Sequence, residues 1–365
     1  PPMKISPRTG KQTFAFSKTD EKFKDLQNHP NQKVQTLVAA RLGTKSTLEE
    51  TRTQRFMDIG NRGRLPVPLK YYAAHTGRWG GSDNVNLQNI PRNSVLKQAI
   101  QAPKGFVIVN SDSSQIEARV LAWLAGQNNL VEAFANGDDV YKMMASKIFL
   151  KDIRDINKEE RFVGKTTILG CGYGMGAKKF SNQLKAFGML VDVERCKKIV
   201  YTYRKAVPFI PQFWRHAQDG LEAIIQGKYL QITKQKQALD IIPNVGFDLP
   251  NKLQLRYPDL KKEQDSSGEY YYSYKSKKDR INIYGGKVVE NICQAVARCV
   301  IGEQMLRVAK RYKVVMTVHD AVTCIAPEQE AEEAAEYVTK CMEWRPDWCQ
   351  GLPLNCETEY GKSYG

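Results

Sequence analysis

A continuous apolar run opens the most regular part of the sequence. Phe106–Val109 has no polar interruption and predicts a buried strand, and Ile116–Leu124 repeats apolar residues at helical spacing and predicts a helix. Asp112 lies between these two segments. We therefore expect Asp112 at the carboxyl end of the strand.

A second pair of strands is predicted nearer the C-terminus. Val314–Val318 and Ala321–Ile325 are apolar and separated by two residues, which is typical of a hairpin with a tight turn. Asp320 is expected at the tip of that turn. An acidic helix near 328–343 follows, and then an alternating edge strand at Leu352–Glu359, where an edge has room for a proline.

The remaining pattern is mainly helical. Apolar residues recur at loosely helical spacing from Lys33 to Ile59, Pro66–Pro68 stops any helix there, and a loop rich in glycine and asparagine runs from Thr76 to Pro91. Helical patterns fill 127–226, and residues 288–308 return to helix. Glycines and two prolines are expected to break the 127–226 stretch, the prolines being Pro208 and Pro211.

Residues Glu263–Gly286, between these helices, are polar and rich in lysine and tyrosine. With Ser-Ser-Gly at its tip, the segment fits a protruding hairpin. We interpret it as a solvated protrusion. The alternative is a contact with duplex DNA or with a partner.

Length and charge narrow the function. A chain of 365 residues should fold into two or three lobes, because single cores stop growing at roughly 250–300 residues. Lysine and arginine number 55 against 39 acidic residues, a net charge of +16, which favours nucleic acid as partner. No run approaches the ~18 apolar residues of a membrane span and no secretion signal is visible, so a cytoplasmic location is expected. The eight cysteines form no C-x-x-C pair and are expected to be reduced, buried thiols.

Asp112 and Asp320 both end strands inside apolar segments, where an unpaired charge is costly to bury. A magnesium ion, bound by few protein oxygens and completed by phosphate oxygens, would compensate them. Two such ions are typical of phosphoryl-transfer sites, including those of polymerases. Each aspartate could instead cap the turn or helix that follows it.

Arg161 and Lys165 stand four residues apart and would project from one face of a helix. If that helix continued, Tyr173 would lie roughly 18 Å from Arg161 at a rise of about 1.5 Å per residue. The two cations would suit a triphosphate and the ring a base or sugar, whereas the alternative is a solvated helix face. Glycines beside Tyr173 favour the close approach of a ligand.

These pieces occur in the order of a known family. The stretch Asp112-Ser-Ser-Gln-Ile-Glu-Ala-Arg119 resembles the first catalytic motif of family-A DNA polymerases, the bacterial DNA polymerase I class. Arg161, Lys165 and Tyr173-Gly174 resemble the fingers-helix motif of the family, and Val318-His319-Asp320 resembles its third motif. Thr76-Gly77-Arg78 and Asn86–Pro91 resemble its primer–template loop. The resemblance runs from about residue 30 to Gly361.

This resemblance implies a right-hand polymerase architecture of the α+β class, with an antiparallel-sheet palm and a helical fingers lobe. It implies a thumb remnant leading into the palm at 1–75, palm at 76–126, fingers at 127–286 with the polar hairpin, and palm again at 287–365. Most of a thumb, and any proofreading nuclease, would then lie outside this sequence.

The same resemblance implies roles for residues near the nucleotide. Asp112, Asp320 and the carbonyl of Ser113 would hold two Mg²⁺ ions. Arg161 and Lys165 would bind the incoming triphosphate, and Lys165 would protonate the departing pyrophosphate.

Selection of deoxynucleotides is implied at the sugar. Glu117 against Tyr173 would leave no space for a 2′-hydroxyl, which excludes ribonucleotides by a clash. Gln115 and Leu169 would also contact the nucleotide.

Contacts with primer–template DNA complete the implied site. Arg78 would meet minor-groove acceptors, which look alike in all correct pairs, so it would sense mispairs without reading sequence. Gln294 and His319 would lie near the primer end. The loop residues implied are Asn86, Gln88 and Asn89. Deoxynucleoside triphosphates and primer–template DNA are the expected partners, with replication accessory proteins as further candidates, and DNA affinity should fall with salt.

Three departures from the family pattern qualify these roles. Ala321 replaces a usual glutamate, and Asn291 is shifted by one position from the family's asparagine. Leu169 replaces a phenylalanine or tyrosine, so no hydroxyl compensates for a missing sugar 3′-hydroxyl and dideoxynucleotides are expected to be poor substrates. Together these changes resemble phage-encoded members more than bacterial repair enzymes.

Two other functions stay open. A single-subunit RNA polymerase would share the aspartates and the Arg-Lys-Tyr helix, although Glu117 argues against it. A basic duplex-binding module that has lost catalysis is the other alternative, motivated by Ala321.

Overall fold

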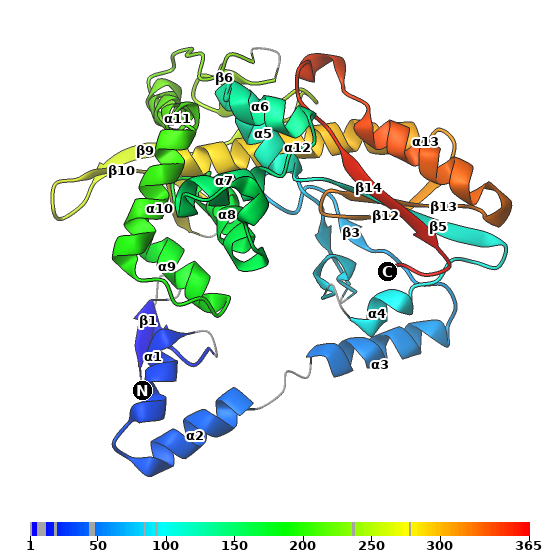
Figure 1. Ribbon diagram of the computed structural model, residues 1–365, viewed down its shortest axis with the longest axis horizontal. Coiled ribbons are helices and arrows are strands. Elements are labelled where there is room, and N and C mark those ends of the chain that lie inside the picture. Colours follow the sequence, from blue (N-terminus) through cyan, green and yellow to red (C-terminus); the bar gives the residue numbers. More distant parts are fainter. Residues whose placement is uncertain are drawn as a thin grey trace. The chain divides into compact units, whose positions relative to one another are not determined.

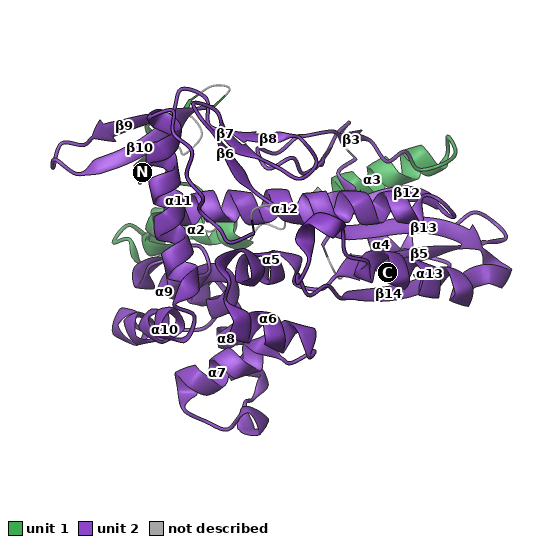
Figure 2. Cartoon of the chain, turned by 90° about the horizontal axis from the view of Figure 1, so that it is seen from above, with its two compact units in different colours: residues 1–65, 276–280 green, residues 66–275, 281–365 purple. Residues whose placement is uncertain are grey.

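The computed structural model describes residues 2–5, 12–17, 20–43, 48–83, 85–91, 94–235, 238–276 and 279–365. It divides into two compact units (Figure 2). One comprises residues 1–65 with 276–280, and the other comprises residues 66–275 with 281–365. Every residue predicted for the site lies in the larger, second unit.

The first unit combines a small ribbon with short helices. Strands β1 (Met3–Ile5) and β2 (Gln12–Phe14) pair antiparallel. Helices α1 (Glu21–Lys24), α2 (Gln32–Gly43) and α3 (Leu48–Gly60) follow. The helical spacing predicted between Lys33 and Ile59 is thus confirmed over α2 and α3.

A four-stranded antiparallel sheet anchors the second unit, in the order β12-β13-β5-β14. Its strands are β5 (Phe106–Ser113), β12 (Lys313–Val318), β13 (Ala321–Pro327) and β14 (Cys356–Gly361). Helices α12 (Gly285–Val308) and α13 (Ala331–Glu343) pack on one face, where Val109, Val322 and Met342 are fully buried. Because side chains alternate along a strand, Asp112 points to the opposite face.

The predicted strands and hairpin are confirmed, with one shift. β14 is an edge strand as expected, but it begins at Cys356 rather than at Leu352. Pro353 lacks the N–H that a sheet ladder requires, and Leu352 is buried in the core of the helical lobe instead.

A helical lobe fills the stretch from residue 116 to residue 225. Its helices are α5 (Ile116–Ala125), α6 (Asn128–Ala135), α7 (Val140–Phe149), α8 (Lys158–Cys171), α9 (Ala177–Ala186), α10 (Val193–Ala206) and α11 (Phe209–Ile225). They share a hydrophobic core with α12, which runs from this lobe to the sheet (Figure 1). Pro211 was predicted to break this stretch, but it lies in the first turn of α11, where no intrahelical N–H bond is lost.

Short elements complete the unit. Strands β3 (Leu69–Lys70) and β4 (Gly80–Gly81) pair with each other, and α4 spans Val95–Gln98. Two three-stranded sheets follow α11. The first contains β6 (Asp240–Ile242), β7 (Gly246–Asp248) and β8 (Gln254–Arg256), and the second contains β9 (Lys261–Gln264), β10 (Tyr270–Lys275) and β11 (Arg280–Ile283).

The predicted polar hairpin corresponds to β9 and β10. Its interpretation as a solvated protrusion is confirmed for the tip, where residues 264–270 are exposed. It is wrong for the base, because Tyr272 and Tyr274 are buried and the Tyr272 hydroxyl donates to Glu222 of α11 at 2.5 Å. Tyr270 remains exposed. The base of the hairpin is therefore packed onto the helical lobe, and its tip lies in solvent.

Two glycines let α12 begin in close backbone contact with its neighbours. A Cβ atom at Gly285 would lie 1.9 Å from the Trp214 carbonyl oxygen, and one at Gly286 would lie 2.5 Å from the Tyr173 carbonyl oxygen. Both distances are far below van der Waals contact. Any larger residue would push α12 away from α11 and from Tyr173.

The eight cysteines are free, seven of them buried and Cys356 partly exposed, so their predicted burial is largely confirmed. Among the described residues, no helix is both long and apolar enough to cross a membrane.

Candidate active site

The two predicted metal-binding aspartates meet at one edge of the four-stranded sheet. Asp112 lies one residue before the end of β5 and pairs with Ala321, the first residue of β13. The backbone N–H of Ser113 donates to the carbonyl of Asp320 at 3.3 Å. Asp320 occupies the β12–β13 turn beside His319, whose φ of 54° is left-handed. The fold therefore brings both aspartates side by side, as the shared metal site implied by the family resemblance requires.

Their surroundings differ from the prediction that both charges are buried. Asp112 is exposed on the open sheet face, and Asp320 is only partly buried. The continuous apolar run before Asp112 packs mainly through alternate residues, so it does not enclose the aspartate itself.

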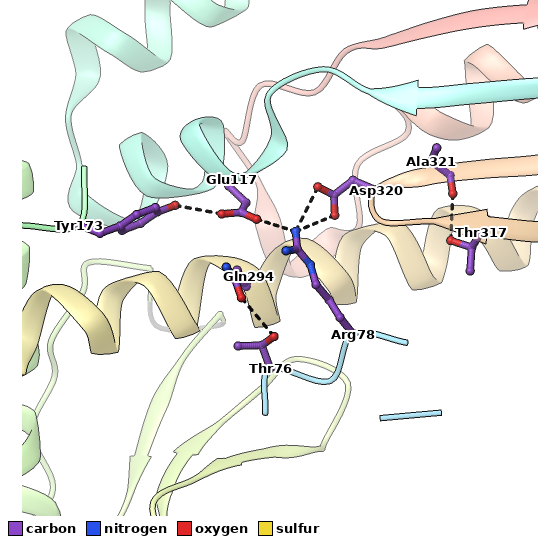
Figure 3. A network of polar contacts seen from close by, with 8 residues as sticks. All are labelled: Thr76, Arg78, Glu117, Tyr173, Gln294, Thr317, Asp320 and Ala321. Atoms are coloured by element: carbon purple, nitrogen blue, oxygen red, sulfur yellow. Dashed lines mark hydrogen bonds and ion pairs between the residues drawn. The ribbon is translucent and has the colours of Figure 1, made fainter. Parts of the chain in front are cut away.

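Asp320 has a cationic partner inside the protein. The Nη2 group of Arg78 donates to both carboxylate oxygens of Asp320, at 3.0 and 3.2 Å, and to Glu117 Oε1 at 2.5 Å (Figure 3). One guanidinium nitrogen thus bridges two carboxylates. Burial alone would lower the pKa of Arg78, but the charges of Asp320 and Glu117 outweigh it and raise that pKa.

Glu117 joins this network to the helical lobe. It lies in the first turn of α5, and the Tyr173 hydroxyl donates to its Oε2 at 3.4 Å (Figure 3). Burial raises the pKa of Glu117, and the nearby charge of Asp320 adds to this rise although Arg78 opposes it. Burial also holds the pKa of Tyr173 well above its ordinary value, so its hydroxyl stays protonated.

A cleft of about 850 Å³ opens over this network. It brings together most of the residues predicted for metal and nucleotide. They are Asp112, Ser113, Gln115, Glu117, Lys165, Leu169, Tyr173 and Asp320, and His319, predicted near the primer end, lines the cleft as well. Such a volume lies within the ~300–1,000 Å³ typical of small-molecule sites.

Arg161 lies outside the lining of that cleft. Its Nε donates to Asp139 at 2.6 Å, and its guanidinium carbon lies 5.4 Å from the centre of the Tyr141 ring. Lys165 Nζ lies 5.9 Å from the same ring and does line the cleft. Tyr141 therefore supports both cations, although no sequence motif marked it.

Helix α8 does not continue to Tyr173 as the spacing argument assumed. It begins with a capping box between Asn157 and Glu160 and ends at Cys171, and Gly174 then adopts a left-handed φ of 82°. The predicted separation of roughly 18 Å between Arg161 and Tyr173 therefore does not apply. The turn instead directs Tyr173 toward Glu117.

The predicted DNA contacts divide into two groups. Arg78, Gln88 and His319 share a crevice of about 30 Å³, and Thr76 Oγ1 donates to Gln294 of α12 at 3.4 Å. Asn86 and Asn89 belong to a short turn instead, in which the Asn86 side chain accepts from the Gln88 backbone at 3.1 Å and caps the 3₁₀ turn Leu87–Asn89. Asn86 thus has a local structural role.

Two carboxylates in the cleft belong to none of the motifs identified in the sequence. Glu357 pairs with Asp112 across β14 and β5, and Glu359 pairs with Asn110. Both line the cleft. Their spacing of two residues on an edge strand was the available signal, because it places them on one face.

Asp112, Asp320 and the Ser113 backbone carbonyl offer the oxygen ligands that a hard divalent cation prefers. Within the described ranges, no three His, Cys, Asp or Glu side chains are already arranged around a common metal position. The guanidinium of Arg78 stands in for a cation at Asp320. The donor set therefore fits magnesium once the Asp320 carboxylate releases Arg78 and is free to bind the ion.

Comparison with known proteins agrees with this geometry. The family model described as DNA polymerase family A matches residues 2–365. The chain belongs to DNA polymerase family A. The match begins at residue 2, well before the start near residue 30 that the motifs indicated.

Relatives of this family-A chain include phage and bacterial enzymes. It is 30% identical over 342 residues to the DNA polymerase of Bacillus phage SP02, covering 80% of this chain and 52% of that protein. It is 29% identical over 313 residues to the thermostable DNA polymerase I of Thermus thermophilus, covering 83% and 32%. The chain thus spans about half the length of the phage relative and about a third of the length of the bacterial one.

Among solved structures, the POL domain of Pol1 from M. smegmatis, in complex with DNA primer-template and dNTP, superposes with a TM-score of 0.67. The match covers all of this chain and 58% of that chain, at 21% identity. It confirms the predicted α+β polymerase fold, with an antiparallel sheet and a helical lobe.

Proposed function

We propose that this chain is the polymerase part of a template-directed DNA polymerase that extends a primer 3′ end with deoxynucleoside triphosphates. The meeting of Asp112 and Asp320 beside the large cleft carries the proposal. Lys165 and Tyr173 line the same cleft. Family membership favours DNA synthesis over the RNA polymerase alternative.

In this proposal Asp112, Asp320 and the Ser113 carbonyl hold two Mg²⁺ ions. When bound, the ions activate the primer hydroxyl and stabilise the leaving group. Lys165 holds the triphosphate and donates a proton to departing pyrophosphate. Arg161 joins it by exchanging the Asp139 carboxylate for a phosphate.

The remaining residues select and orient the substrates. Glu117 and Tyr173, already hydrogen-bonded to each other, exclude a 2′-hydroxyl, while Gln115 and Leu169 contact the nucleotide. Primer–template DNA contacts Arg78, and the other proposed contacts are Asn86, Gln88, Asn89, Gln294 and His319. The net charge of +16 attracts the DNA backbone.

We assign palm to 76–126 and 287–365, fingers to 127–286, and a thumb remnant to 1–75. The reaction belongs to phage or cellular DNA replication, with accessory proteins as further partners.

Primer extension by the purified protein tests this function. Asp112→Ala should abolish extension while duplex binding persists, because Asp112 is exposed and its removal leaves no cavity in the core. Glu332→Ala, at an exposed residue of α13, is the matched control and should extend normally. Extension that survives Asp112→Ala, or preferential use of ribonucleotides, contradicts the proposal. A wild type that binds duplex without extending it supports the inactive-module alternative.

A further inference from the structure

Arg298 of α12 packs against two aromatic rings beside the predicted DNA-binding loop. Its guanidinium carbon lies 5.5 Å from the centre of the Tyr71 ring and 5.7 Å from that of Trp79. The two ring centres are 6.5 Å apart, with planes inclined by 47°. Arg298 follows Gln294 by four residues, so both project from the same face of α12.

Arg298 differs from the other arginines near the site in its acidic partners. Throughout the described ranges, no carboxylate forms an ion pair with it. Arg78 and Arg161, by contrast, are each bound to acidic side chains. Arg298 therefore presents a guanidinium that packs against two rings and that has no acidic acceptor in the part of the chain that the structure describes.

Its location points to a ligand. Arg298 lines the crevice of about 30 Å³ together with Gln88, His319 and Asp320. That volume suits about one water and excludes a nucleobase, so a ligand has to approach from the mouth of the crevice. In the proposed function Asp320 marks the place of the primer end, and Arg298 lies next to it.

We propose that Arg298 binds a backbone phosphate of the primer strand just upstream of the 3′ end. The two rings pack against the guanidinium from neighbouring directions, and its remaining N–H groups can bond two phosphate oxygens at once. Because the rings already restrict the Arg298 side chain, less side-chain freedom is lost on binding. This inference rests on the proposed function, since it takes Asp320 as marking the primer end.

Replacing one charged phosphate of the DNA at a time by a neutral group identifies which phosphate Arg298 contacts. Primer–template duplexes carrying one methylphosphonate at successive places in either strand are titrated against wild type, Arg298→Ala and Arg298→Lys. We expect Arg298→Ala to weaken binding of the unmodified duplex by about tenfold and to reduce the slope of log K against log salt by about one. One primer methylphosphonate should weaken wild type by a similar factor and leave Arg298→Ala unchanged.

Arg307→Ala is the matched control. Arg307 lies on the same helix and stacks on Trp344 at 4.3 Å, but it does not line the crevice. Its loss should leave duplex affinity and salt slope unaltered. Arg298→Lys keeps the positive charge but lacks the paired N–H donors of the guanidinium. It should retain the slope of log K against log salt but lose part of the affinity for the duplex. Thermal unfolding of each variant confirms that it folds.

Equal duplex affinity for Arg298→Ala and wild type overturns the inference, as does coupling only to a template-strand phosphate. If Arg298→Ala does not fold, an Arg298→Lys variant with wild-type affinity for every duplex overturns it in the same way. A wild type that neither binds nor extends a primer–template refutes the proposed function itself, which keeps the two failures distinct.

Discussion

The Arg78 bridge leads to a quantitative expectation for metal binding in the absence of DNA. Because one guanidinium nitrogen occupies both oxygens of Asp320, an incoming cation has to displace it. Arg78→Ala removes this competitor. The free Arg78→Ala protein should then bind Mn²⁺, a convenient probe for the proposed magnesium site, more tightly than free wild type does.

The size of the effect follows from the contact. Hydrogen bonds between charged groups contribute about 1.5–3 kcal/mol. The side chains of Arg78 and Asp320 are 21% and 20% exposed, and Arg78 divides its Nη2 between two carboxylates, so the lower end applies. A difference of about 1.5 kcal/mol corresponds to roughly a tenfold lower dissociation constant for Mn²⁺.

Mn²⁺ titration followed by electron paramagnetic resonance measures this constant directly. Arg161→Ala is the control, because it removes the same formal charge from a pair with Asp139 that lies outside the cleft lining. Asp320→Ala should weaken Mn²⁺ binding. Primer–template DNA should tighten Mn²⁺ binding to wild type more than to Arg78→Ala, since the DNA offers Arg78 new acceptors. An Mn²⁺ affinity that is unchanged in Arg78→Ala, or raised equally by Arg161→Ala, would refute the competition.

Three further predictions concern the cleft. Leu169→Tyr should raise incorporation of dideoxynucleotides relative to deoxynucleotides by at least about tenfold in steady-state assays, while Leu169→Phe, which lacks the hydroxyl, should not. Glu117→Ala should raise ribonucleotide incorporation by at least about tenfold, because an overpacking clash costs about 1–3 kcal/mol, and unchanged discrimination would count against the proposed role of Glu117. The raised pKa of Glu117 means that its favourable contribution to stability is complete below its ordinary value of 4.5 and is lost as pH rises through the higher folded-state pKa. Glu117→Gln should therefore gain stability relative to wild type between pH 4 and pH 7 in urea unfolding, and the opposite trend would contradict this assignment.

The elements that hold the aspartates were predictable because their signals are local. The apolar runs around Asp112 and Asp320 and the two-residue turn between strands fix where strands end. Pairing of Asp112 with Ala321 then follows from the antiparallel sheet. The exposure of Asp112 was missed because a run without polar residues conceals which alternate side chains face solvent.

Contacts between distant segments could not be predicted in the same way. Arg78 and Asp320 lie 242 residues apart, and no spacing rule relates a loop arginine to a turn aspartate. The pairing of Arg161 with Asp139 and the support from Tyr141 likewise depend on how α7 packs on α8. A motif identifies such residues but not the partners they have before substrate arrives.

The glycine contacts at the start of α12 restrict how the cleft rearranges. Gly286 touches the Tyr173 carbonyl with no side chain between them, and Gln294 follows about two turns further along the same helix. Because no side chain separates these two backbone segments, a displacement of Tyr173 is passed on directly to α12. The end of α8 near Arg161 has its own backbone contact, with α7, because a Cβ atom at Gly164 would lie 2.1 Å from the Tyr141 carbonyl oxygen. If the proposed function requires the cleft to close over a nucleotide, α7 and α8 therefore have to move together.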